Sequence, residues 1–99
     1  GTTSEVDYLV QIEGAIVPIE VKSGTTGSLK SLHVFAAEKQ IPLAVRFNSD
    51  PPRVDRVTSR VPRIPEHTFT LLSLPLYLAP ELRRLVSAQS RNTYTSQLS

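Results

Sequence analysis

The stretch Glu5–Lys22 constrains the fold of this chain more than any other. Its sequence is EVDYLVQIEGAIVPIEVK. Apolar and polar residues alternate over Val6–Ile12 and again over Ala15–Val21, which is the spacing of a β-strand with one buried face. The Glu13-Gly14 pair between the two runs suits a two-residue β-turn, since glycine tolerates positive φ. The stretch therefore predicts a β-hairpin.

This hairpin is expected to have one charged face and one apolar face. A turn at Glu13-Gly14 places Asp7 opposite Glu20 and Glu5 opposite Lys22, so that all four charged side chains share a face. The opposite face is expected to enter a core, and it carries Val6, Tyr8, Val10, Val17, Ile19 and Val21.

The carboxylates of Asp7 and Glu20 allow two interpretations. Like charges directly opposite each other on paired strands destabilise the pair. A hard divalent cation such as Mg²⁺, which binds through one or two carboxylates and keeps several waters, would compensate for this repulsion. A solvated polar face with one Lys22–Glu20 salt bridge would also accommodate it. The pattern alone leaves both interpretations open.

The same residues carry a family resemblance. Asp7, followed after twelve residues by Glu20-Val21-Lys22, resembles the motif of the PD-(D/E)xK nucleases, the restriction-endonuclease-like superfamily. A longer set of segments is similar to one branch, the C-terminal domain of unknown function that follows the ATPase module in many bacterial and archaeal AAA-type ATPases. This likeness covers roughly residues 4–80, through the segments EVDYLV, VPIEVKSG, GSLKSLHVF, PLAVRF and LPLYL.

The resemblance implies a metal-dependent DNA phosphodiesterase. In that family Asp7 and Glu20 would hold Mg²⁺ or Mn²⁺, Lys22 would attend the attacking water, and Glu5 would be an auxiliary carboxylate. The implied partners are DNA and an ATPase module upstream in the same chain. The alternative is a non-catalytic module that keeps the nuclease-like fold for assembly of that ATPase or for partner binding.

Length and composition fit a single small domain. A chain of 99 residues buries about 60–70% of its unfolded surface, and we expect one nuclease-like domain over residues 1–89 with a polar, disordered tail over 90–99. The chain contains no cysteine, which excludes a disulfide framework and a zinc-thiolate site. It also contains no methionine, so we expect an N-terminally truncated fragment. No apolar run approaches the roughly 18 residues of a membrane span, so we expect a cytoplasmic protein with no membrane partner.

The remaining segments predict an α/β fold. Ser28 suits a helix N-cap, and apolar residues then recur at helical spacing to about Gln40. The strand 43–47 follows a crossover and should therefore run parallel to Ala15–Val21. Further strands are expected at 54–59 and 67–74, with a final helix at 81–88. We expect a mixed β-sheet of four or five strands with flanking helices, a truncated restriction-endonuclease-like core whose uncovered sheet surface favours homo-oligomers.

Positive charge is concentrated in the second half of the chain. Residues 1–49 have four basic and five acidic side chains, whereas residues 50–99 have seven arginines and four acidic side chains. Such a basic segment could contact phosphates, although a solvated surface loop is the simpler interpretation. The candidate nucleic-acid contacts are Lys30, Arg53, Arg56, Arg60 and Arg63.

Two further side chains and the absent motifs complete the prediction. We expect His33 to face water or form a local hydrogen bond, because metal-dependent cleavage of this type needs no histidine. Arg46 lies in an apolar strand, where an arginine more often pairs with a carboxylate or extends toward solvent than binds a ligand. The sequence has no GxxxxGK loop, so we expect no nucleotide site in this fragment, and it has neither GxSxG nor HExxH.

Overall fold

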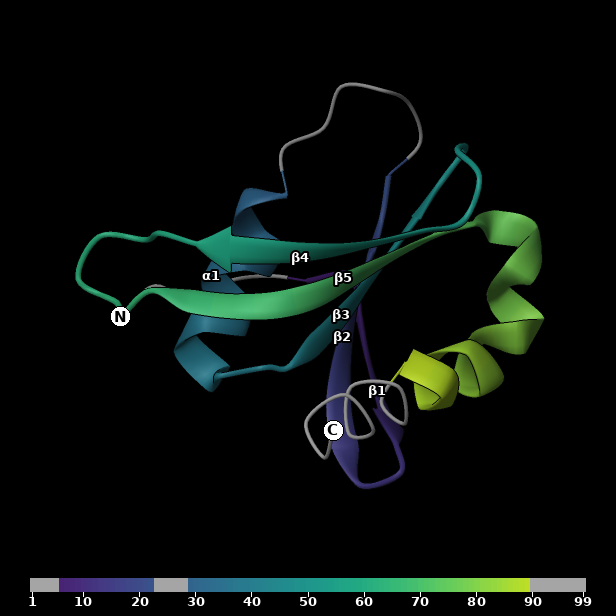
Figure 1. Cartoon of the computed structure of the whole chain (residues 1–99), viewed down its shortest axis with the longest axis horizontal. Coiled ribbons are helices and arrows are strands. Elements are labelled where there is room, and N and C mark those ends of the chain that lie inside the picture. Colours follow the sequence, from purple (N-terminus) through teal and green to yellow (C-terminus); the bar gives the residue numbers. More distant parts are fainter. Residues whose placement is uncertain (1–5, 23–28, 90–99) are drawn as a thin grey trace, which may run out of the picture.

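The computed structural model describes residues 6–22 and 29–89 and contains a five-stranded mixed sheet (Figure 1). The strand order is β1-β2-β3-β5-β4, with β1 and β4 at the two edges. This arrangement confirms the predicted α/β class and mixed sheet. The strands are β1 (Tyr8–Ile12), β2 (Ala15–Val21), β3 (Leu43–Asn48), β4 (Arg53–Ser59) and β5 (His67–Pro75).

The β1–β2 hairpin forms in the predicted register. Glu13 and Gly14 both have positive φ, 51° and 82°, as a tight turn between right-twisted strands requires. The antiparallel ladder begins beside this turn and ends at the pair Tyr8–Ile19. Asp7 lies one residue beyond the ladder, in a bend, so it is not paired with Glu20 in the way the sequence predicted.

Helix α1 (Lys30–Lys39) is the crossover between β2 and β3, and it makes those two strands parallel as predicted. The helix stops at Gln40, which adopts the left-handed conformation and donates its backbone N–H to the carbonyl of Ala36. The N–H of Ile41 reaches the same carbonyl at 2.9 Å. Pro42 then prevents further helix, since it lacks an N–H donor.

Strand β5 lies between β3 and β4, parallel to the first and antiparallel to the second. Every residue from Phe69 to Pro75 is buried, because a central strand is covered on both faces. The predicted strands at 54–59 and 67–74 are thereby confirmed, each slightly longer than expected. Figure 1 shows β4 and β5 side by side, joined by a long turn.

Two apolar clusters cover opposite faces of the sheet. Helix α1 packs on one face, in a cluster of Leu32, Ala36, Ile41, Ala44, Phe69 and Leu71. The other face is covered by the 3-10 helix η1 (Leu76–Glu81) and by a helix over 82–89, which contributes Val86. The predicted final helix at 81–88 thus exists, and η1 precedes it because Pro80 cannot donate the hydrogen bond of an α-helix.

The hairpin faces differ from their prediction at the open end. Tyr8 and Val21 were expected in the core but are 61% and 37% exposed. Val6 was expected beside Tyr8, yet it packs against the α1 cluster on the other face. The alternation is lost there because β1 stops at Tyr8, so residues before it no longer follow the pleat.

Some predictions lie outside the described residues. The Ser28 cap, the auxiliary carboxylate of Glu5 and the tail 90–99 are among them. Within the part of the chain that the structure describes, no helix has the length and apolar character needed to cross a membrane.

Candidate nuclease-like site

Glu20 is the buried carboxylate of the candidate site. It projects from β2 onto the face that α1 covers, and only 11% of its side chain is exposed. Its Oε1 lies 3.5 Å from the Lys22 Nζ. Its Oε2 is buried and has no hydrogen-bond partner among the described residues. A buried carboxylate oxygen without a protein partner is rare, and an ordered water or a bound ion commonly satisfies it.

Asp7 contacts the same end of β2 through a hydrogen bond to the backbone. Its Oδ2 accepts a hydrogen bond from the backbone N–H of Val21 at 2.8 Å. If the ladder continued, that N–H would pair with the backbone of Val6, so the carboxylate takes the place of a ladder bond. Asp7 is exposed whereas Glu20 is buried, which makes the pair a partly solvated site at the open end of the hairpin.

Lys22 completes the group that the sequence predicted. Its backbone N–H donates to the carbonyl of Phe47 at 2.8 Å, which fixes it against β3. Its side chain is 30% exposed and extends toward Glu20. The structure therefore places all three residues at the end of β2, with Lys22 beside Glu20 and with Asp7 bonded to the backbone of Val21.

The donor set limits the kind of metal that this site could hold. In the part of the chain that the structure describes, no three His, Asp or Glu side chains are grouped closely enough to bind an ion. Two carboxylates remain, which is the protein contribution that Mg²⁺ often uses when water and phosphate oxygens supply the other ligands. The unpartnered Oε2 of Glu20 fits such a role.

A polar row crosses the sheet beside Glu20. Glu20 on β2 is the register neighbour of Arg46 on β3, and Arg46 is the neighbour of Ser73 on β5. The Arg46 guanidinium donates to the Ser73 Oγ from Nε at 3.2 Å and from Nη2 at 3.0 Å. Arg46 thus bonds a hydroxyl, whereas the sequence favoured either a carboxylate partner or extension toward solvent. Sequence reasoning missed this row because it depends on β5 lying beside β3.

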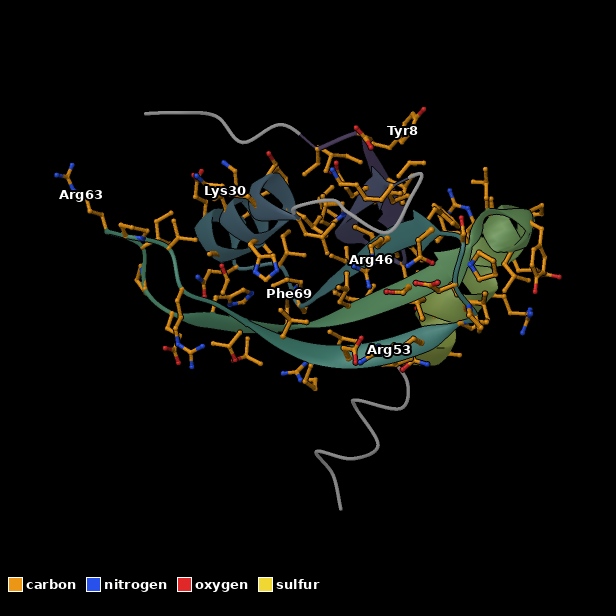
Figure 2. The ribbon with its side chains drawn as sticks, turned by 90° about the horizontal axis from the view of Figure 1, so that it is seen from above. Tyr8, Lys30, Arg46, Arg53, Arg63 and Phe69 are labelled. Carbon is orange, nitrogen blue, oxygen red and sulfur yellow. The ribbon has the colours of Figure 1, made fainter. Side chains whose placement is uncertain are left out.

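The five candidate nucleic-acid contacts are not one surface. Arg53 is the neighbour of Ser73 on β4 and pairs with Asp55 at 3.0 Å. Arg56, three residues along the strand, points to the opposite face, where it donates to Thr70 at 2.7 Å. Figure 2 shows Arg63 at the far tip of the β4–β5 connection, well away from Arg53.

Lys30 and Arg60 lie together at another place. They line a pocket of about 310 Å³ between α1 and the end of β4, together with His33. Arg60 also pairs with Glu66 at 3.1 Å, and both side chains are mostly exposed. Figure 2 shows Lys30 on α1, closer to Arg63 than to Arg53.

His33 is half-buried against an aromatic ring. Its ring meets that of Phe69 edge to face, with centroids 5.5 Å apart. Burial lowers the pKa of His33 below its ordinary value. Its backbone carbonyl accepts a hydrogen bond from the buried Ser59 hydroxyl at 3.0 Å. These contacts are structural, and none of them involves Glu20 or Asp7.

Comparison with known proteins gives one match. A family model described as "Domain of unknown function (DUF4143)" matches residues 1–77. This span includes Asp7, Glu20 and Lys22 and ends just after β5, so the 82–89 helix lies outside it. Neither the curated proteins nor the solved structures contain a significant match to this chain.

Proposed function

The chain belongs to the DUF4143 family of domains of unknown function, since the match spans residues 1–77 of its 99 residues, and we propose that it is a metal-dependent DNA phosphodiesterase domain. The observation that carries this proposal is the unpartnered Oε2 of the buried Glu20. Burial of a charged oxygen is costly unless a partner satisfies it, and a bound cation would be such a partner.

Each residue has a role in this proposal. Asp7 and Glu20 would hold a Mg²⁺ or Mn²⁺ ion at the open end of the hairpin. The ion, when bound, supplies a positive charge to the phosphate and an acidified water as nucleophile. Lys22, with its Nζ 3.5 Å from Glu20, orients Glu20 and donates to the water or to the negative charge that develops on the phosphate.

The likeness to the PD-(D/E)xK nucleases supports the same assignment. Asp7, Glu20 and Lys22 lie on or next to the strands of a β-hairpin that is followed by an α-helix and a parallel strand. We further propose that the domain works as the C-terminal part of an AAA-type ATPase, whose motor would act on the same DNA. Glu5, the auxiliary carboxylate of this proposal, lies outside the described residues.

A non-catalytic role in assembly is the second candidate, and one observation favours it. The β1–β2 hairpin exposes Tyr8 at 61%, Leu9 at 53% and Ile16 at 45%. Tyr8 and Leu9 belong to the edge strand β1, and exposed apolar side chains there are suited to contact a partner, such as the ATPase module or a second copy of the chain. Both roles can share the fold, and only catalysis requires the carboxylates.

DNA cleavage tests the proposal. We expect the unchanged protein to cleave plasmid DNA with Mg²⁺ or Mn²⁺ and not with chelator, and we expect Glu20→Gln to lose this activity. Glu38→Gln is the matched control, because it removes the same charge from an exposed position on α1. Equal cleavage by the unchanged protein and by Glu20→Gln would assign the activity to a contaminant and leave the assembly role.

A further inference from the structure

A second pocket lies beside the candidate site, at the ends of β3 and β5. It has a volume of about 340 Å³ and is lined by Arg46, Asn48, Asp50, Pro51, Pro52, Arg53 and Ser73. Arg46 and Ser73 belong to the polar row that includes Glu20, so the pocket lies on the same face of the sheet as that carboxylate. Helix α1 covers Ala44 and Leu71 on this face, two residues before Arg46 and Ser73 along their strands.

The guanidinium of Arg46 is incompletely satisfied in this pocket. It is half-buried, and its recorded hydrogen bonds both go to the hydroxyl of Ser73. Among the ion pairs of the described residues, none involves Arg46. A guanidinium has five N–H donors in a planar fork, so three remain for another acceptor. A half-buried positive charge normally has an anionic partner, because desolvation is costly without one.

The chemistry of the lining favours a phosphate group as that partner. Arginine binds phosphate oxygens with two parallel hydrogen bonds, which suits it better than lysine to this task. Arg53 provides a second guanidinium at the rim, where its pair with Asp55 is 72% exposed on the arginine side and therefore weak. Pro51 and Pro52 form a wall that has no N–H donors, and Asp50 adds one carboxylate to the lining, so an anion in this pocket depends on the two arginines.

The pocket lies directly beside the candidate metal site, so a strand bound at one would also pass the other. Arg46 and Glu20 are Cα partners on adjacent strands, and adjacent strands lie about 4.8 Å apart. We infer that the Arg46 pocket binds a substrate phosphate next to the one that is cleaved. That this phosphate belongs to a substrate rests on the proposed function, whereas the binding of a phosphate group depends only on the pocket.

Binding measurements with chelator present test the pocket without cleavage. We expect Arg46→Met to bind a fluorescein-labelled DNA duplex about tenfold more weakly, as for loss of a charge-assisted contact. Its salt dependence should fall by about one unit of slope. Arg84→Met is the matched control, because Arg84 is exposed on the 82–89 helix over the opposite face, and it should bind like the unchanged protein.

Inorganic phosphate and thymidine 5′-monophosphate identify the source of the phosphate. If either raises the melting temperature of the unchanged protein and not of Arg46→Met, the pocket accepts a free phosphate as well as a strand. If only DNA responds to the substitution, the ligand is a strand phosphate. Both results support the pocket, and equal DNA binding by Arg46→Met and Arg84→Met overturns it.

Two additional variants keep the test decisive. Arg46→Lys retains the charge but not the planar fork, so it should fold and still bind more weakly than the unchanged protein. If Arg46→Met does not fold, normal DNA binding by Arg46→Lys overturns the inference. Glu38→Gln leaves both the candidate site and the pocket unchanged and should bind DNA normally in chelator. Because chelator removes the metal, these measurements separate the two proposals: a protein without nuclease activity can still show the Arg46 effect, and a nuclease can lack it.

Discussion

We expect Glu20→Gln to be more stable than the unchanged protein in chelator and less stable than it with Mg²⁺. In the metal-free protein the substitution removes a charge from a side chain that is 11% exposed and has one oxygen without a partner. The pair between Oε1 and Lys22 is the interaction that it weakens, at 3.5 Å. Glutamine has nearly the same shape, so packing against the neighbouring strands is retained.

Two contributions set the expected change in the free energy of unfolding. A buried polar group without a partner costs about 1–3 kcal/mol, and more when it is charged. The lost pair contributes about 0–1 kcal/mol, since the lysine is partly solvated. The amide of glutamine still lacks a partner, so part of the cost remains. We expect a net gain of about 1 kcal/mol in the free energy of unfolding, which for a domain of this size raises Tm by about 4–8 °C.

Millimolar Mg²⁺ should reverse the order of the two proteins. A ligand at about 100 times its Kd stabilises the folded state by about 2.7 kcal/mol, and only the unchanged site gains this energy. Thermal melts followed by circular dichroism, with chelator and with Mg²⁺, measure both effects. Glu38→Gln serves again as the control and should follow the unchanged protein in both buffers.

One result would refute this reasoning. If Glu20→Gln melts below the unchanged protein in chelator and Mg²⁺ shifts neither melt, Glu20 is a structural partner of Lys22. The buried oxygen would then not report a cation, and the proposed function would lose the observation on which it rests.

Three further predictions follow from individual contacts. Asp7→Ala should lose about 0.5–1.5 kcal/mol of unfolding free energy in chelator, because it removes the 2.8 Å acceptor of the Val21 N–H. Asp7→Asn keeps an oxygen there and should lose less, so equal losses in urea titrations would contradict the bond. Burial lowers the pKa of His33, so stability should be complete above the unfolded value of 6.5 and fall as pH drops below it toward the lowered folded pKa. His33→Gln should remove this part of the fall in Tm, and identical pH profiles would exclude it. Arg60→Ala with Arg63→Ala should reduce the salt slope of DNA binding by about two units if both contact phosphate; an unchanged slope would make the connection a solvated loop.

Local sequence patterns predicted which strands and helices form better than they predicted which side chains are buried. The Glu13-Gly14 turn set the register of the hairpin, and that register holds as far as the pair Tyr8–Ile19. These features depend on backbone conformation and on residues close in sequence. The sequence therefore predicted the hairpin, the crossover helix and the parallel strand.

Burial at the site depends on distant residues and was not predicted. Glu20 was expected on a charged face open to solvent, whereas it is buried because β3 lies beside it and α1 packs on that face. Arg46 was not a candidate, since its partner Ser73 is 27 residues away and becomes its neighbour only through the strand order. Alternation along one strand contains no information about such neighbours.

The placement of β5 in the middle of the sheet also determines when the molecule can be completed. The β1–β2 hairpin joins residues close in sequence and can fold early, while one edge of β3 stays unpaired until residues 67–75 are available. Pairing that closes a long loop is slow, because the entropy of closure is lost before the contacts form. During synthesis on a ribosome, the hairpin end with Asp7, Glu20 and Lys22 can therefore form before Ser73 is added to the chain. A nascent chain that stalls before β5 exposes the open edge of β3, which makes this edge the point where chaperones or aggregation would act.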